Sequence, residues 1–151
     1  MRLAWIALLA ATAAAGPVHA QARFVPMVGF DLFEGATIGL GYDIPLARAA
    51  GDASIVVAVR PSAEVTEVGS GRRTGLRLNG DVLGRVVLSG LGFVPYGKLG
   101  AVAEVGARAR YGFQPGVSYG AGVEVRRAFV EFSGALTSGI SQPRVAVGYR
   151  L

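Results

Sequence analysis

The chain has 151 residues, of which 52% are apolar and 17% charged, and its formal net charge is +5. This composition excludes an intrinsically disordered chain, which combines low hydrophobicity with high net charge. The 23 glycines disfavour a helical domain, because glycine destabilises a helix by about 1 kcal/mol relative to alanine. A single domain is expected at this length.

The first twenty residues, MRLAWIALLAATAAAGPVHA, differ in composition from the rest of the chain. Arg2 precedes an apolar run that ends at Ala15, and Val-His-Ala then forms a cleavage site of small residues. This order is typical of a secretory signal peptide. The run is shorter than the roughly 20 apolar residues that a membrane-spanning helix needs. We therefore predict a signal peptide at 1–20 and a single exported domain at 21–151.

The chain contains one histidine, His19, and no cysteine. Cleavage after residue 20 would remove His19, so the exported domain would lack the usual general base and the soft metal ligands. Ser118, Ser133 and Ser138 have no evident base among their neighbours in the sequence. The basic residues are scattered instead of clustered, which disfavours nucleic-acid binding. We expect no enzymatic activity, no cofactor, no metal and no nucleic-acid partner.

Apolar residues recur at every second position through the rest of the chain, which is the period of a β-strand. Turn-forming residues such as Glu34-Gly35 and Gly69-Ser70-Gly71 separate the alternating segments. Eight strands are predicted, at 24–33, 36–46, 54–68, 74–88, 94–109, 117–126, 128–136 and 144–151.

Prolines lie inside several of these segments. Because proline cannot donate to the hydrogen-bond ladder, Pro26, Pro45 and Pro61 each imply a bulge, a bend or a strand end. Pro61 is the hardest of the three to place, so the third strand is expected to stop near Arg60.

The charged residues of the strands share one parity, and the large apolar side chains occupy the other. The charged parity has seven basic and seven acidic groups, and small residues such as Gly39, Gly41 and Gly120 lie between them. The predicted charged face comprises Asp31, Asp43, Arg60, Glu64, Arg77, Asp81, Arg85, Lys98, Glu104, Arg108, Glu124, Arg126, Glu131 and Arg150.

The alternation is compatible with two kinds of barrel, one with the charged face inside and one with the apolar face inside. Most of the predicted strands are longer than the roughly 5–6 residues usual in soluble proteins and reach the about 9–11 residues of a tilted membrane strand. Small residues on the charged face leave room for paired charges in a narrow lumen. We therefore predict an all-β fold: a closed, antiparallel, up-and-down, eight-stranded transmembrane β-barrel with the charged face inside. The alternative is a soluble periplasmic barrel of lipocalin or avidin type, with the apolar face lining a pocket for a hydrophobic ligand.

The chain ends in Gly148-Tyr149-Arg150-Leu151. This stretch resembles the C-terminal signature of bacterial outer-membrane barrels, which is glycine, a hydrophobe, any residue and a terminal hydrophobe. Leu151 stands where the usual terminal residue is aromatic. The whole of 21–151 resembles the small eight-stranded barrels, such as OmpA-type transmembrane domains and OmpX. The resemblance implies a Gram-negative outer membrane and an assembly machinery that recognises Gly148, Tyr149 and Leu151.

The predicted external connections, 34–35, 69–73, 110–116 and 137–143, are short, which disfavours a receptor-binding role through long loops. Arginine binds phosphate through its planar fork, so these loops are expected to contact lipopolysaccharide or other lipid headgroups. The predicted contacts are Arg72, Arg73, Arg110 and Arg144.

The paired charges should plug the lumen. We expect a monomer with a structural or membrane-integrity role and little or no conductance. The alternative is a narrow, weak porin-like pore that opens when pairs such as Arg85 and Glu104 exchange partners.

Overall fold

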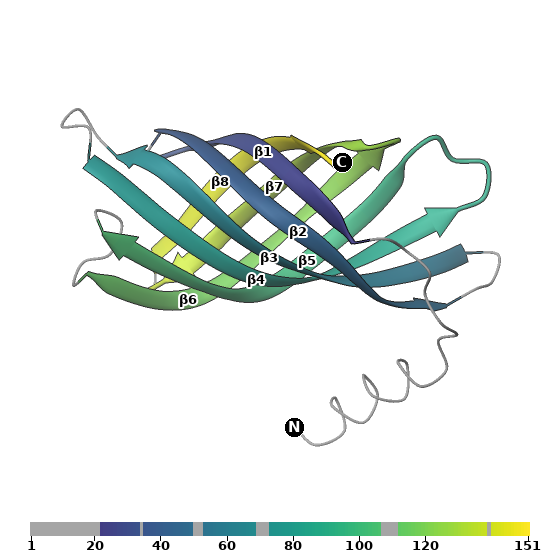
Figure 1. Cartoon of the computed structure of the whole chain (residues 1–151), viewed down its shortest axis with the longest axis horizontal. Coiled ribbons are helices and arrows are strands. Elements are labelled where there is room, and N and C mark those ends of the chain that lie inside the picture. Colours follow the sequence, from purple (N-terminus) through teal and green to yellow (C-terminus); the bar gives the residue numbers. More distant parts are fainter. Residues whose placement is uncertain (1–21, 34, 50–52, 69–72, 107–111, 139) are drawn as a thin grey trace, which may run out of the picture.

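The structure, a computed structural model, describes residues 22–33, 35–49, 53–68, 73–106, 112–138 and 140–151. Each strand pairs antiparallel with the next, and β8 pairs with β1 to close the barrel (Figure 1). The predicted closed, up-and-down, eight-stranded fold is confirmed. None of the described residues forms a helix long and apolar enough to cross a membrane. The strands are β1 (Arg23–Asp31), β2 (Gly35–Ala49), β3 (Ala53–Val68), β4 (Arg73–Leu88), β5 (Val94–Gly106), β6 (Phe113–Val125), β7 (Ala128–Thr137) and β8 (Ile140–Tyr149).

The two parities of the strands face opposite sides of the barrel wall. Ile38 is 69% exposed on the outer surface, whereas Arg60 is only 2% exposed inside. Because side chains alternate along a strand, the outer surface is apolar and the lumen holds the charged groups. A soluble lipocalin-type barrel would have the reverse arrangement.

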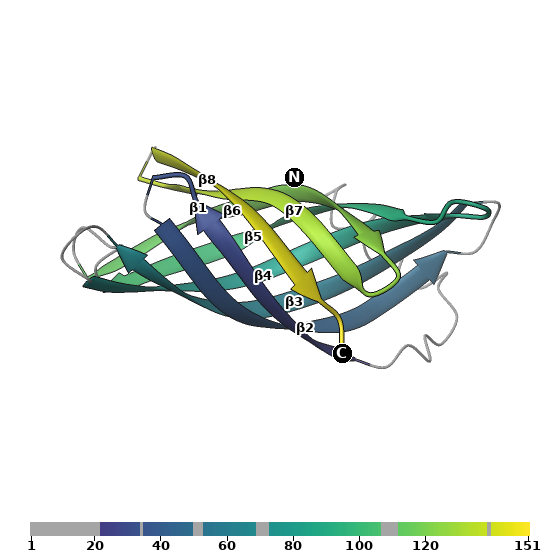
Figure 2. The same ribbon diagram turned by 90° about the horizontal axis from the view of Figure 1, so that it is seen from above.

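The end of the barrel at which the C-terminus lies is uneven. The β1–β2 pairing stops at Arg23↔Asp43, whereas the β2–β3 pairing continues to Ala49↔Ile55. Figures 1 and 2 show that β2, β3 and β4 extend beyond the start of β1 and the end of β8. We call this the C-terminal end, and the end at which β1 and β3 finish and β2 and β4 begin the opposite end.

Two of the predicted loops consist mostly of strand residues. The segments 110–116 and 137–143 were predicted to be external connections, but β6 begins at Phe113 and β8 at Ile140. Pro115 and Pro143 lie inside these strands and pair with Ala103 and Gly134. The fixed φ of proline is compatible with extended backbone, so the cost is a missing donor and not a strand end.

Pro45 and Pro61 behave differently from each other. The register of β2 against β3 shifts between Pro45 and Ala47, so the predicted irregularity at Pro45 is confirmed. The predicted stop near Arg60 is wrong, because β3 continues through Pro61 to Val68 and Pro61 pairs with Gly80.

Gly120 lies on the inner face of β6, where the neighbouring strand approaches closely. A Cβ atom at this position would lie 2.7 Å from Ser133 Cβ and 3.0 Å from both Ser133 Cα and the Phe132 carbonyl oxygen. Two of these three atoms belong to the backbone of β7, which cannot move without disturbing the β6–β7 pairing. The absence of a side chain is therefore a packing requirement here.

Replacing Gly120 with alanine should lower the free energy of unfolding by about 1–3 kcal/mol, the usual cost of overpacking. Gly97→Ala is the matched control, because its Cβ would meet only the Gly120 carbonyl oxygen, at 3.9 Å. Urea titration of the folded barrel in detergent micelles measures both variants. Equal midpoints for G120A and G97A would contradict this account of the lumen-facing glycines.

Candidate functional site

The lumen is the candidate site, because it gathers most of the predicted charged residues. Of the fourteen, Arg126 is exposed in a turn, and Arg108 lies outside the described residues. The other side chains face the interior and are at most 19% exposed. These twelve are Asp31, Asp43, Arg60, Glu64, Arg77, Asp81, Arg85, Lys98, Glu104, Glu124, Glu131 and Arg150.

The prediction that Arg126 faces the lumen is wrong. Arg126 lies in the turn between β6 and β7, is exposed, and has a φ of 58°. The connection comprises only Arg126 and Arg127, and a two-residue hairpin turn requires positive φ, so the strand alternation ends before it.

The prediction that Arg144 contacts lipid headgroups from a loop is also wrong. Because β8 begins at Ile140, Arg144 lies within the strand on its inward parity and is 3% exposed. It forms an ion pair with Glu64, and its guanidinium lies 3.3 Å from Glu131. Of the other predicted headgroup contacts, Arg73 begins β4, and Arg72 and Arg110 lie outside the described residues.

Asp43 is the centre of the group of charges nearest the C-terminal end. Its carboxylate accepts hydrogen bonds from Arg60 Nε at 2.5 Å and Arg60 Nη2 at 3.2 Å, and from Arg85. Arg150 lies 3.5 Å from the same carboxylate and bonds to Glu124 at 2.5 Å. Glu124 also lies 3.5 Å from Arg85. Two acids and three arginines therefore form one connected group, in which each buried charge has at least one partner of opposite sign.

Glu131 is the centre of a second group of charges, in the middle of the lumen. Its carboxylate lies 2.8 Å from Lys98 Nζ, 3.3 Å from Arg144 and 3.7 Å from Arg60, and it accepts a 3.0 Å hydrogen bond from the Tyr96 hydroxyl. Since Arg60 touches both Asp43 and Glu131, it joins this group to the one at the C-terminal end.

The opposite end of the lumen is organised by Arg77 and Glu104. Their side chains lie 2.8 Å apart, and Arg77 is also 3.7 Å from Asp31. Thr137 and Gln142 each donate to Glu104 at 3.2 Å. The suggested pairing of Glu104 with Arg85 is wrong, because the β4–β5 register sets Arg77 opposite Glu104 and Arg85 opposite Tyr96.

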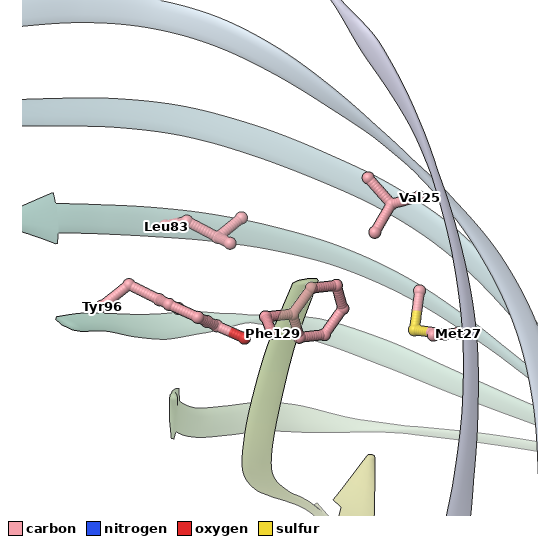
Figure 3. Packing of buried hydrophobic residues seen from close by; sticks show 5 residues of the cluster. All are labelled: Val25, Met27, Leu83, Tyr96 and Phe129. Atoms are coloured by element: carbon pink, nitrogen blue, oxygen red, sulfur yellow. The ribbon is translucent and has the colours of Figure 1, made fainter. Parts of the chain in front are cut away.

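An apolar cluster crosses the lumen near the C-terminal end (Figure 3). It joins Val25 and Met27 of β1 to Leu83 of β4, Tyr96 of β5 and Phe129 of β7. Strands β1 and β5 lie on opposite sides of the barrel, so the cluster extends from one wall of the lumen to the other. The Phe129 ring packs edge-on against Tyr96, with ring centroids 6.3 Å apart. The Arg60 guanidinium lies over the Phe129 ring, 5.1 Å from its centroid.

The apolar layer in the lumen was not predicted from the sequence, although the alternation of inward and outward residues indicates it. Leu83 lies between outward-facing Val82 and Gly84, on the parity of the charged residues. Phe129 likewise follows Ala128 and precedes Val130, which both face outward. Large apolar residues on a charged parity indicate a packed interior layer.

No family model and no curated protein matches the chain. The N-terminal β-barrel domain of OprF from Pseudomonas aeruginosa is similar in structure, with a TM-score of 0.62, 14% identity, and coverage of 86% of this chain and 96% of that domain.

Two structures of Ail from Yersinia pestis also align. The first, in complex with the heparin analogue sucrose octasulfate, has a TM-score of 0.42 and 14% identity, over 86% of this chain and 95% of Ail. The second, described as the outer membrane protein in a phospholipid bilayer nanodisc, has a TM-score of 0.40 and 12% identity, over 87% of this chain and 100% of Ail. The resemblance of this chain to the small eight-stranded barrels is confirmed at the level of the fold.

Proposed function

We propose that this protein is an integral outer-membrane β-barrel with a structural or membrane-integrity role, whose lumen is closed by its own side chains. The observation that carries the proposal is the inverted distribution of side chains. Leu99 is 62% exposed on the outer surface, whereas Glu104 of the same strand is fully buried inside. An apolar exterior matches hydrocarbon, and barrel closure leaves no unpaired strand edge in the apolar layer.

Strand length supports the membrane assignment. The shortest strands, β1, β7 and β8, have 9, 10 and 10 residues. A tilted strand needs about 9–11 residues to cross the apolar layer. The predicted signal peptide at 1–20 would export the chain, and a barrel of this kind belongs in the outer membrane. The chain termini of such a barrel face the periplasm, so the C-terminal end of the lumen is the periplasmic end.

The contents of the lumen support a closed barrel over an open pore. The apolar cluster around Phe129 occupies the periplasmic half, and ion pairs occupy the layers on both sides of it. Ions would have to displace these groups to pass. We propose little or no steady conductance and assign no catalytic step to the protein.

Assembly and lipid contacts complete the proposal. In β8, Gly148 and Tyr149, followed by Leu151, would be recognised by the barrel-assembly machinery. Arg72, Arg73 and Arg110 remain proposed contacts for lipopolysaccharide, and the barrel would act as a monomer.

Heat-modifiability tests the proposal. Membranes from cells that express the full chain are dissolved in SDS, and unboiled and boiled samples are compared on a gel. A closed membrane barrel should sediment with the membranes and resist SDS until it is boiled, so its mobility should change on boiling. A band in the soluble periplasmic fraction with the same mobility before and after boiling would contradict the proposal.

A further inference from the structure

A trough crosses the apolar outer surface near the C-terminal end. It encloses about 620 Å³, within the range of small-molecule pockets, and it draws residues from β2, β1, β8, β7 and β6. One side is a row of outward side chains paired across five neighbouring strands. This row is Ile38, Val28, Val147, Val130 and Val123. The other side is formed by Pro26, Tyr149, Ala128 and Val125.

The floor of the trough is made by residues that face the lumen. Met27 pairs with Gly39 on one side and with Gly148 on the other, and Gly148 pairs with Phe129. These inward residues contribute little bulk to the outer surface, and the two rows of outward side chains stand on either side of them. Neighbouring strands are about 4.8 Å apart, so five strands give a trough about 19 Å long, which suits an extended acyl chain.

Two arginines lie at one mouth of this trough. Val125 and Ala128 line it, and the residues between them are Arg126 and Arg127, both exposed. The turn is held at the rim because the Arg127 carbonyl accepts a 2.8 Å hydrogen bond from the Arg150 amide. Within the part of the chain that the structure describes, no acidic side chain lines the trough. The neighbouring Glu124 faces the lumen instead, where Arg150 and Arg85 neutralise it.

We propose that this trough binds an anionic phospholipid of the inner leaflet, with one acyl chain between the two rows and the phosphate on Arg126 and Arg127. The proposal rests on the proposed function, because it requires a lipid-facing exterior with its C-terminal end toward the periplasm. Charge complementarity favours an anionic ligand. Among the described residues neither guanidinium has an acidic partner, so the two arginines favour a headgroup with net negative charge over a zwitterionic one. The position at the periplasmic end favours a phospholipid over lipopolysaccharide, which occupies the other leaflet.

Native mass spectrometry of the folded protein tests the proposal. The protein is extracted from membranes in a non-ionic detergent and equilibrated with phosphatidylglycerol, phosphatidylcholine or lipopolysaccharide. The wild type should retain phosphatidylglycerol preferentially. R126Q/R127Q should weaken that retention by about tenfold or more, because each arginine near an anionic surface contributes roughly fivefold. R48Q is the control, since Arg48 is exposed at the end of β2 and does not line the trough.

A second pair of variants tests whether the trough binds the acyl chain. Ala128→Phe fills the trough and should displace phosphatidylglycerol, whereas Ala101→Phe places the same ring on the outer face of β5, away from the trough, and should not. Equal retention of phosphatidylglycerol and phosphatidylcholine, preferential retention of lipopolysaccharide, or equal loss in R48Q and R126Q/R127Q would overturn the inference. The same samples are boiled and run on gels. A heat shift without lipid preference refutes only the lipid site, whereas absence of both refutes the membrane barrel.

Discussion

Replacing Arg60 with glutamine is expected to lower the free energy of unfolding by about 3–5 kcal/mol, the usual cost of removing one partner of a buried ion pair. Arg60 is 2% exposed and bonds to Asp43, approaches Glu131 and covers the Phe129 ring. The variant therefore breaks the link between two charge groups and uncovers an aromatic ring. Urea titration of the folded barrel in micelles, followed by circular dichroism, measures the change.

Arg48→Gln is the matched control for this variant. Arg48 lies near the end of β2 and is exposed, so the same chemical change should alter stability by less than about 0.5 kcal/mol. Arg60→Lys should fall between the two, because lysine keeps the charge and loses the planar fork that reaches both oxygens of Asp43. Equal unfolding midpoints for R60Q and R48Q would show that the lumenal ion pairs contribute nothing to stability.

Replacing Phe129 with alanine is expected to destabilise the barrel by about 3–5 kcal/mol and to open the lumen to ions. Phe129 is 3% exposed and packs against Tyr96 of β5, so its removal leaves a cavity in the apolar layer that crosses the lumen. Planar-bilayer recordings should show no steady current from the wild type and frequent, measurable openings from F129A.

Phe132→Ala is the control, because Phe132 lies on the same strand, three residues further along, and faces outward with 56% exposure. It removes the same ring without touching the lumen and should leave the conductance unchanged. Large, stable currents from the wild type would contradict the closed-lumen account. A silent F129A that remains folded by heat-modifiability would show that the apolar layer is not the barrier.

The fold could be predicted from the sequence because every strand of a closed barrel separates two different environments. Leu78 and Val82 face outward and Arg77 and Asp81 face inward in the same strand, so the alternation reports the barrel wall directly. The loops were less predictable. Pro115 and Pro143 signal a break in isolation, but the residues before and after each of them pair with a neighbouring strand and keep the backbone extended. Arg144, predicted to lie in a loop, therefore lies in β8 and faces the lumen.

The partners of the lumenal charges could not be predicted from the sequence. Parity assigns a face but not a register, and the register decides that Arg77 lies opposite Glu104. Arg85 meets Asp43 instead, although β2 and β4 are not neighbouring strands, because long side chains cross the narrow lumen. The outer trough was equally hidden, since it depends on the alignment of Gly39, Met27 and Gly148 across three strands.

The accessibility of the outer face to lipid tests the central claim most directly. The chain has no cysteine, so a single cysteine at Val82 or Leu99 can carry a nitroxide label, and the labelled barrel is reconstituted in phosphatidylcholine vesicles. Both positions face outward from neighbouring strands, at 44% and 62% exposure. We predict strong relaxation of the label by oxygen, which concentrates in the hydrocarbon, and weak relaxation by a water-soluble nickel chelate. Stronger relaxation by the nickel chelate at both sites would place this face in water and contradict the membrane barrel.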